Sequence, residues 1–153
     1  MSFNGFSDNT VTSTVKNSAW FPDLDTGVFQ NSYRLPAEYQ QGMVEEHIRL
    51  AMVWVNRQLR EWKANHEAAG HNHFNEVPSE DLGDSTEHQV LYQRAVFCHA
   101  KGLLLKQFAT VNRRDAASNE AKESEETEDK FMEFARDAIA DILDIPRIGV
   151  EAL

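Results

Sequence analysis

The segment from Ser85 to Val111 constrains the fold more than any other part of the chain. Its apolar side chains recur at helical spacing and form an arc wider than a single stripe. The main row comprises Leu91, Ala95, Cys98, Gly102, Leu105 and Ala109, and the row beside it comprises Val90, Phe97, Leu104 and Phe108. A helix that is apolar over so broad an arc is typical of the central member of a helical bundle.

Two positions refine the expectation for this helix. Ser85 or Asp84 is expected to cap its start, because side-chain oxygens of these residue types accept hydrogen bonds from the free amides of a first turn. Gly102, in its middle, costs about 1 kcal/mol relative to alanine. A close approach of another helix at Gly102 would offset that cost.

Two helices are expected before the central one. Asp25 is expected to cap a short helix over residues 26–34, and Pro36 suits the first turn of a long helix over residues 37–69. Gly70 is expected to end the long helix in a left-handed conformation. The long helix carries one apolar row of Val44, Ile48, Ala51, Val55, Leu59 and Trp62, and a second row of Met43, His47, Leu50 and Trp54. A packed core is the commonest cause of such rows.

A last helix is expected after a strongly acidic stretch. The helical period of apolar residues begins at Phe131, and Pro146 stops it. The acids between residues 115 and 130 are expected to lie in a solvated loop or a frayed helix end.

The two ends of the chain are predicted to be extended. Residues 1–19 are rich in Ser, Thr and Asn and are expected to form a flexible arm. Trp20 and Phe21 then either pin this arm to the bundle or form a site reserved for a partner. The tail from Arg147 to Leu153 alternates apolar and polar side chains. The predicted fold class is therefore all-α: a bundle of about four helices, forming a single domain over residues 20–153, with an extended arm and an extended tail.

Charge and composition exclude several classes of protein. The chain of 153 residues carries 15 Lys and Arg against 25 Asp and Glu, a net charge of −10, which argues against general binding to a phosphate backbone. No apolar run approaches the ~18 residues of a membrane span, and the start has no secretory pattern. A single cysteine, Cys98, excludes a disulfide framework within one chain, so we expect folding in a reducing cytoplasm.

The sequence offers no convincing catalytic constellation, so we expect neither an enzyme nor a cofactor. Cys98 and His99 are neighbours, and neighbours in a helix point about 100° apart, which disfavours a nucleophile–base pair. The histidines allow one alternative, a zinc or nickel site formed by His66, His71 and His73, with His88 if the loop folds back. A polar loop without metal explains the same residues.

The order of several short motifs along the chain resembles one known family. These motifs are Trp20–Asp25, Leu50–Trp62, Val77–Pro78, Leu82–Ser85, Tyr92–Val96, Ala135–Ile139 and Arg147–Glu151. Together they cover roughly residues 20 to 153. In this order and spacing the chain resembles the phage head completion proteins, the GPL family of temperate phages with contractile tails.

The resemblance implies a structural head–tail adaptor. Copies of such a protein bind beneath the portal ring after DNA packaging, complete the head, retain the DNA and form the surface to which the tail attaches. The expected partners are the portal protein, neighbouring copies in a dodecameric ring and a tail-side completion protein. DNA is expected to pass through without sequence-specific binding, and no membrane is involved. The expected location is the head–neck junction of the virion, after assembly in the host cytoplasm.

Two groups of residues are expected to serve this role. Contacts to the portal or a neighbouring subunit are expected from Trp20, Phe21, Arg147, Ile148, Val150 and Leu153. An acidic surface that repels the DNA in the channel is expected from Glu123, Glu125, Glu126, Glu128 and Asp129. A tail folded against its own bundle is the alternative for the first group, and a solvated face is the alternative for the second.

Other functions remain open at this level. The same features fit a small regulatory helical protein that binds a host factor, or a metal-binding protein that uses the histidine loop. A third alternative, a tail-terminator or packaging subunit, lies within the same phage machinery.

Overall fold

The chain folds into a mainly helical domain. The computed structural model describes residues 12–112 and 119–146, with side chains described up to Ala109 and again from Glu128. The elements in chain order are β1 (Thr14–Val15), β2 (Leu24–Asp25), α1 (Thr26–Ser32), α2 (Gln41–Gln58), α3 (Arg60–Ala68), the 3-10 helix η1 (Phe74–Glu76), α4 (Glu87–Asn112) and α5 (Asn119–Ile142). None of the helices in these ranges is long and apolar enough to cross a membrane.

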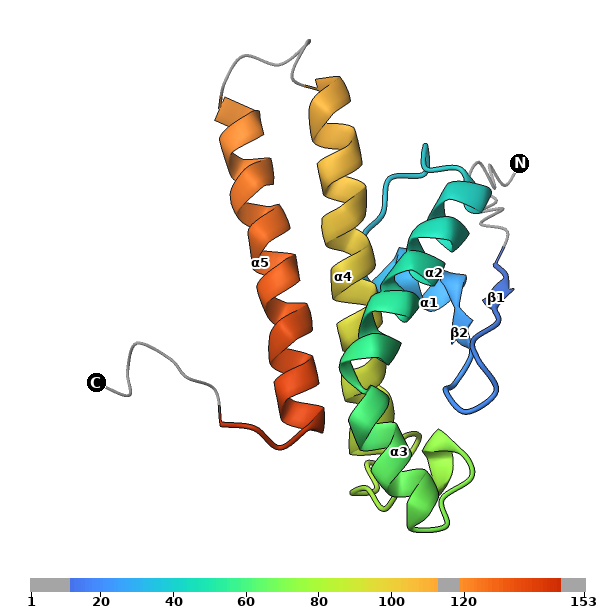
Figure 1. Ribbon diagram of the computed structural model, residues 1–153. Coiled ribbons are helices and arrows are strands. Elements are labelled where there is room, and N and C mark those ends of the chain that lie inside the picture. The colour runs from blue at the N-terminus through green and yellow to red at the C-terminus, as the bar shows by residue number, and fades with distance from the viewer. Residues whose placement is uncertain (1–11, 113–118, 147–153) are drawn as a thin grey trace.

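Helix α4 is the centre of the domain, as its broad apolar arc predicts. Helix α5 packs along one side of α4 as the second arm of a long hairpin, and α2 packs on another side (Figure 1). The rings of Tyr92 and Phe97 on α4 are fully buried, and Phe97 stacks on Phe29 of α1 with ring centroids 4.8 Å apart. Helix α4 therefore packs against α1, α2 and α5.

The close approach predicted at Gly102 is present. A Cβ atom built at this glycine would lie 2.7 Å from Cε and 3.1 Å from Sδ of Met132 on α5. Those distances are shorter than van der Waals contact, so a side chain at position 102 would displace Met132. The glycine permits the α4–α5 hairpin to pack tightly at this level.

The helix starts were predicted with mixed success. Asp25 does cap α1, because its Oδ1 accepts a hydrogen bond of 2.6 Å from the amide of Gly27. The start of α4 differs from the prediction of Ser85 or Asp84. Thr86 and Gln89 form reciprocal bonds there, in which each side-chain oxygen accepts from the other's backbone amide. This Thr-x-x-Gln capping box is readable in the sequence, although the preceding Gly-Asp-Ser also has the composition of a helix start.

The predicted long helix over residues 37–69 is wrong in its start and its continuity. Residues 36–39 form a turn, closed by the hydrogen bond from the Tyr39 amide to the Pro36 carbonyl at 3.1 Å. Helix α2 begins at Gln41 and is interrupted at buried Leu59, where ψ is 9°. The short helix α3 follows and ends before Gly70, whose φ of +96° confirms the predicted left-handed position.

From Asn119 onward the acidic stretch before Phe131 is helical, which corrects the predicted loop or frayed end there, whereas Asp115 lies outside the described residues. Helix α5 starts at Asn119, twelve residues before the apolar period resumes at Phe131. Glu, Lys and Ala are good helix formers even where no apolar stripe reports a buried face. Apolar periodicity therefore underestimated this helix.

Part of the predicted arm belongs to the packed domain. Thr14 and Val15 form β1, which pairs antiparallel with β2, placing Thr14 opposite Asp25 and Val15 opposite Leu24. Val15 is fully buried. The predicted flexibility of residues 1–11 lies outside the described residues.

Candidate functional site

An aromatic cluster holds the N-terminal segment against α3, η1 and the first turns of α4. Trp20 and Phe21 are each only 6% exposed. The Trp20 ring meets the rings of Trp62 and Phe74 edge-on at 5.8 Å, and Phe21 stacks on Tyr92 of α4 at 5.3 Å. This packing is the first of the two alternatives given for Trp20 and Phe21, which is pinning of the arm to its own bundle. Their contact with a portal or a neighbouring subunit stays a prediction.

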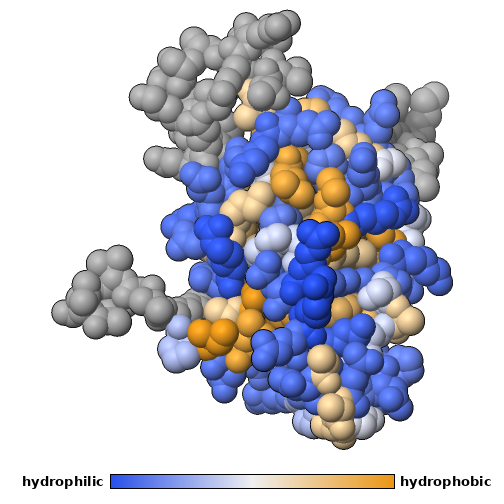
Figure 2. Space-filling view, viewed as in Figure 1, coloured by the Kyte–Doolittle hydropathy of each residue, from blue (hydrophilic) through white to orange (hydrophobic). Residues whose placement is uncertain are grey.

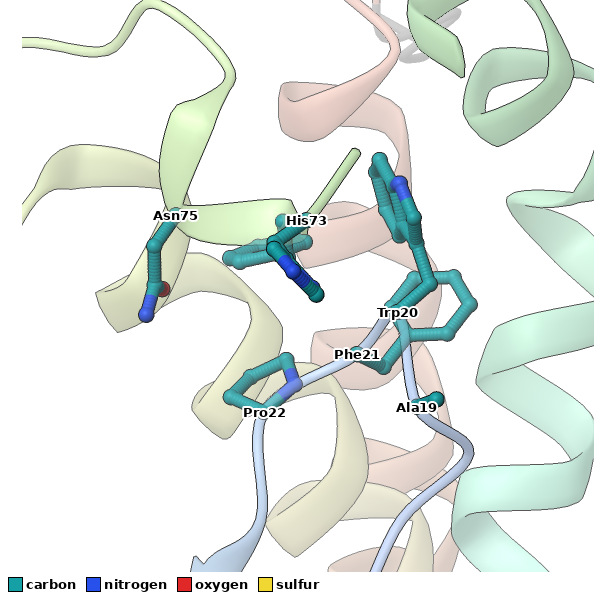
Figure 3. A pocket seen from close by; sticks show the side chains of 7 residues that line it. Ala19, Trp20, Phe21, Pro22, His73 and Asn75 are labelled. Carbon is teal, nitrogen blue, oxygen red and sulfur yellow. The ribbon is translucent and has the colours of Figure 1, made fainter. Parts of the chain in front are cut away.

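Main-chain and indole hydrogen bonds tie the histidine loop to the same cluster. The Trp20 indole donates to the carbonyl of His71 at 3.1 Å, and the amide of Phe74 donates to the carbonyl of Trp20 at 2.9 Å. Between these segments lies a pocket of about 120 Å³, shown in Figure 3 and lined by Ala19, Trp20, Phe21, Pro22, His73, Phe74 and Asn75. A space of this size admits one side chain of a partner, and its lining contains no acid–base pair or nucleophile.

Three side chains close a ring of hydrogen bonds beside the aromatic cluster. Asn17 Nδ2 donates to the Tyr92 hydroxyl at 2.7 Å, Tyr92 donates to Asn56 Oδ1 at 2.6 Å, and Asn56 Nδ2 donates to Asn17 Oδ1 at 3.0 Å. Burial raises the pKa of Tyr92, so its hydroxyl remains protonated and available as a donor. The ring joins the N-terminal segment to α2 and α4.

A second polar network fixes the segment at β1. Ser13 donates its hydroxyl hydrogen bond to Glu45 of α2 at 2.6 Å and receives one from Gln41 at 2.7 Å. The Ser13 bond holds the pKa of Glu45 below its usual range. Thr26, fully buried, also donates to the Ser13 carbonyl at 3.0 Å. These bonds fix the segment at β1 to α1 and α2.

The histidines lie near one another without forming a metal centre. The rings of His66 and His71 are 5.6 Å apart, and His66 and His88 both contact Trp62. Burial lowers the pKa of His66 and of His88, which favours their neutral forms. Among the described residues no group of three or more His, Cys, Asp or Glu side chains is placed to hold a metal ion.

The thiol of Cys98 is buried, as its place on the apolar face predicts. Its Sγ lies 3.6 Å from the Tyr33 hydroxyl. Burial raises the pKa of Cys98 and keeps the thiol protonated, which makes it a poor nucleophile. The arrangement therefore offers no nucleophile–base pair at Cys98 and His99.

The predicted acidic surface is described only at its end. Glu128 is mostly buried and pairs with Lys106 of α4 at 3.4 Å, whereas Asp129 is exposed. The side chains of Glu123, Glu125 and Glu126 lie outside the described residues, as do Arg147, Ile148, Val150 and Leu153 of the tail.

The structure exposes part of α2 that the sequence assigned to the core. Leu50 and Val53 are each 49% exposed, and the half-buried Trp54 stacks on His99 of α4 at 4.2 Å. Leu50 and Trp54 belong to the second apolar row of the long helix, for which a packed core was expected. Val53 lies outside both rows and makes the apolar surface of α2 wider than the two rows alone. This extra width is the signal in the sequence that part of the α2 surface is uncovered.

Comparison with known proteins identifies relatives of this chain and a family model that matches it. It is 27% identical over 139 residues to the "Head completion/stabilization protein" of Escherichia phage P2, an alignment that covers 91% of this chain and 82% of that protein. It is 26% identical over 117 residues to the "Probable head completion/stabilization protein" of Haemophilus phage HP1, covering 76% of this chain and 78% of that protein. No solved structure matches it. The family model for the phage head completion protein (GPL) matches residues 15–153, nearly the whole described domain, and the chain therefore belongs to that family of structural phage head proteins.

Proposed function

We propose that this protein completes the DNA-filled phage head by binding beneath the portal ring, where it retains the packaged DNA and forms the surface for tail attachment. The observation that carries the proposal is the family match over residues 15–153, supported by the two relatives whose names include head completion and stabilization. A domain without a catalytic arrangement among its described residues is consistent with this structural role.

The proposed assembly has three protein contacts. Copies of the chain lie side by side in a ring, with a dodecamer expected on the portal and a monomer in free solution. One face of the ring meets the portal protein and the other meets a tail-side completion protein at the head–neck junction of the virion. DNA passes through the ring without sequence-specific contacts.

The acidic first half of α5 supports the passage of DNA. Helices α4 and α5 extend as a hairpin whose free end lies away from α3 and η1 (Figure 1). We propose that this end faces the channel and presents Glu123, Glu125, Glu126 and Asp129, which repel phosphates. Glu128 contributes less to this surface because its carboxylate pairs with Lys106.

The tail is the proposed contact to the portal or to a neighbouring subunit, through Arg147, Ile148, Val150 and Leu153. An extended segment with alternating apolar side chains can add to an exposed edge or fill small pockets of a partner. Trp20 and Phe21 retain a place in the proposal only through the 120 Å³ pocket that they line, because both rings are largely buried.

Light scattering tests the proposal directly. The purified chain is sized alone and after mixing with the portal protein of the same phage. We expect a compact monomer that joins the portal as a large complex of fixed stoichiometry. A chain that stays monomeric beside an intact portal ring would contradict portal binding and favour the regulatory alternative.

A matched pair of variants locates the contact. Ile148→Asp with Val150→Asp is expected to abolish the complex if the tail carries it. Val28→Asp alters a side chain of α1 that is 39% exposed and should leave the complex intact.

A further inference from the structure

Residues 80–87, which lead into α4, form a tight turn that presents one apolar side chain among carboxylates. Hydrogen bonds from the Leu82 amide to the Ser85 carbonyl and from the Glu87 amide to the Glu80 carbonyl, both at 2.9 Å, close the turn. Leu82 is 54% exposed on it. The sequence has no lysine or arginine between residues 64 and 93, and the acids of the turn are all exposed: Glu80, Asp81, Asp84 and Glu87. We call residues 80–87 the acidic turn.

Helix α2 carries an apolar surface that the described domain leaves partly uncovered. Leu50 and Val53 are each 49% exposed. Leu50 lies three residues before Val53 and four before Trp54, so the three side chains are neighbours on the helix surface. We call Leu50, Val53 and Trp54 the α2 stripe. Figure 2 shows apolar surface on this face over α2 and α4.

Cations lie beside the α2 stripe. Exposed Arg57 follows Trp54 by three residues and therefore shares its face of the helix. Burial lowers the pKa of His99, the stacking partner of Trp54, and the charges of Lys106 and Arg136 lower it further. Among the described residues no carboxylate lies close enough to His99 to raise its pKa. The surface at the stripe therefore favours negative charge in a protein whose net charge is −10.

The acidic turn has the chemistry that this surface fits. Leu82 supplies an apolar side chain for contact with the α2 stripe, and the carboxylates around it supply the charge that Arg57 attracts. Exposed Glu46 lies four residues before Leu50, at the other end of the stripe. Like charges repel, so the carboxylates of the turn are directed toward the Arg57 end.

The acidic turn does not reach the α2 stripe of its own chain. The turn is bonded to Glu87, the first residue of α4, whereas Trp54 of the stripe stacks on His99. Twelve helical residues separate Glu87 from His99, which is about 18 Å along α4. In Figure 1 the turn lies at the end of the domain near α3, and α2 extends away from that end. A contact between the two surfaces therefore joins two copies.

We propose that the acidic turn of one copy docks on the α2 stripe of a second copy. Because the two surfaces differ, the contact is head-to-tail, and it closes into a ring when the rotation between copies allows it. This inference rests on the proposed function, since it names the surfaces through which neighbouring copies meet. Leu82 and three apolar side chains make a small contact, so it forms where the copies are already held side by side.

Cysteine cross-linking in phage particles tests the contact. Phage carrying Leu82→Cys with Leu50→Cys in this protein is assembled, and its particles are purified, oxidised and analysed on a non-reducing gel. We expect a ladder of cross-linked copies, because a disulfide needs Cα atoms less than about 7 Å apart and the two positions of one chain are too far apart to react. Native Cys98 is buried in every variant.

Matched variants separate this contact from random collision. Leu82→Cys with Val28→Cys places the second thiol on α1, at a side chain that is 39% exposed, and should give at least about tenfold less cross-linked chain. Adding Arg57→Glu to the Leu82→Cys and Leu50→Cys variant should weaken the ladder, and a further Asp84→Lys should restore part of it. The assay is repeated with Val53→Cys in place of Leu50→Cys, so that a local disturbance at one position does not decide the result.

The other outcomes are distinct. Yields from Leu50→Cys and Val53→Cys that are no higher than the yield from Val28→Cys would overturn the inference, and so would an internal cross-link in a fast-migrating monomer. A pattern that stops at two copies would show a two-fold pair and contradict the head-to-tail contact. Absence of the unmodified protein from normal particles would instead contradict the proposed function, independently of the cross-linking result.

Discussion

Replacing Tyr92 by phenylalanine tests whether the hydrogen-bonded ring with Asn17 and Asn56 stabilises the domain. The substitution keeps the aromatic ring and its stacking on Phe21 at 5.3 Å. It removes the donor to Asn56 Oδ1 and the acceptor for Asn17 Nδ2. Asn56 Oδ1 then loses its donor, whereas Asn17 Nδ2 keeps its other acceptor, the Pro22 carbonyl at 2.9 Å.

The expected loss follows from the two hydrogen bonds. Each contributes about 1 kcal/mol net, so Tyr92→Phe should lower the free energy of unfolding by about 2 kcal/mol. A larger loss is not expected because Asn17 and Asn56 are half-buried and water can replace part of each bond. For a chain of this length, about 2 kcal/mol corresponds to a fall in Tm of about 4–8 °C.

Urea denaturation of the variant and of the unmodified protein measures this difference. Tyr39→Phe is the matched control, since the Tyr39 ring stacks on Phe108 at 4.4 Å but its hydroxyl has no side-chain partner among the described residues. We expect this control to change the free energy of unfolding by less than about 0.5 kcal/mol. The reasoning is refuted if Tyr92→Phe costs no more than Tyr39→Phe.

Three further predictions concern packing and ionisation. Gly102→Leu should destabilise by about 2 kcal/mol or more in urea denaturation, and Met132→Ala should restore part of that loss by making room; additive effects would contradict the proposed clash. Burial, with smaller contributions from nearby cations, lowers the pKa of His99 to about 4, so the unfolded chain binds its proton first and stability should fall as pH drops from about 6.5 to about 4. After allowance for the partial exposure of this ring, the loss is about 1 kcal/mol, and His99→Phe should remove it from a series of unfolding curves. The pKa of Glu45 measured by NMR should lie below that of an ordinary carboxyl and should rise in Ser13→Ala. The stability that this hydrogen bond contributes should be present above the ordinary pKa and lost as pH falls through the depressed pKa. An unchanged Glu45 pKa in the variant would contradict the assignment of the shift to Ser13.

Local sequence signals determined much of the architecture. The broad apolar arc identified α4 as the central helix, Asp25 marked the start of α1, and Gly102 marked the close approach of α5. These features depend on interactions within a few residues or on the width of one helical face, which a single sequence displays. The order of short motifs along the chain likewise indicated the family, because motif order is a property of the sequence and does not depend on how the helices pack.

Only the tertiary structure decided which faces are covered. Helical spacing places Leu50 and Trp54 on one row, but it does not tell whether another element packs against that row, and Leu50 is in fact half exposed. The same spacing gave no indication that Tyr92 would meet Asn17, which lies 75 residues earlier in the chain. Burial and long-range hydrogen bonds depend on how separate elements are placed in space, and a residue's own periodicity carries no information about that placement.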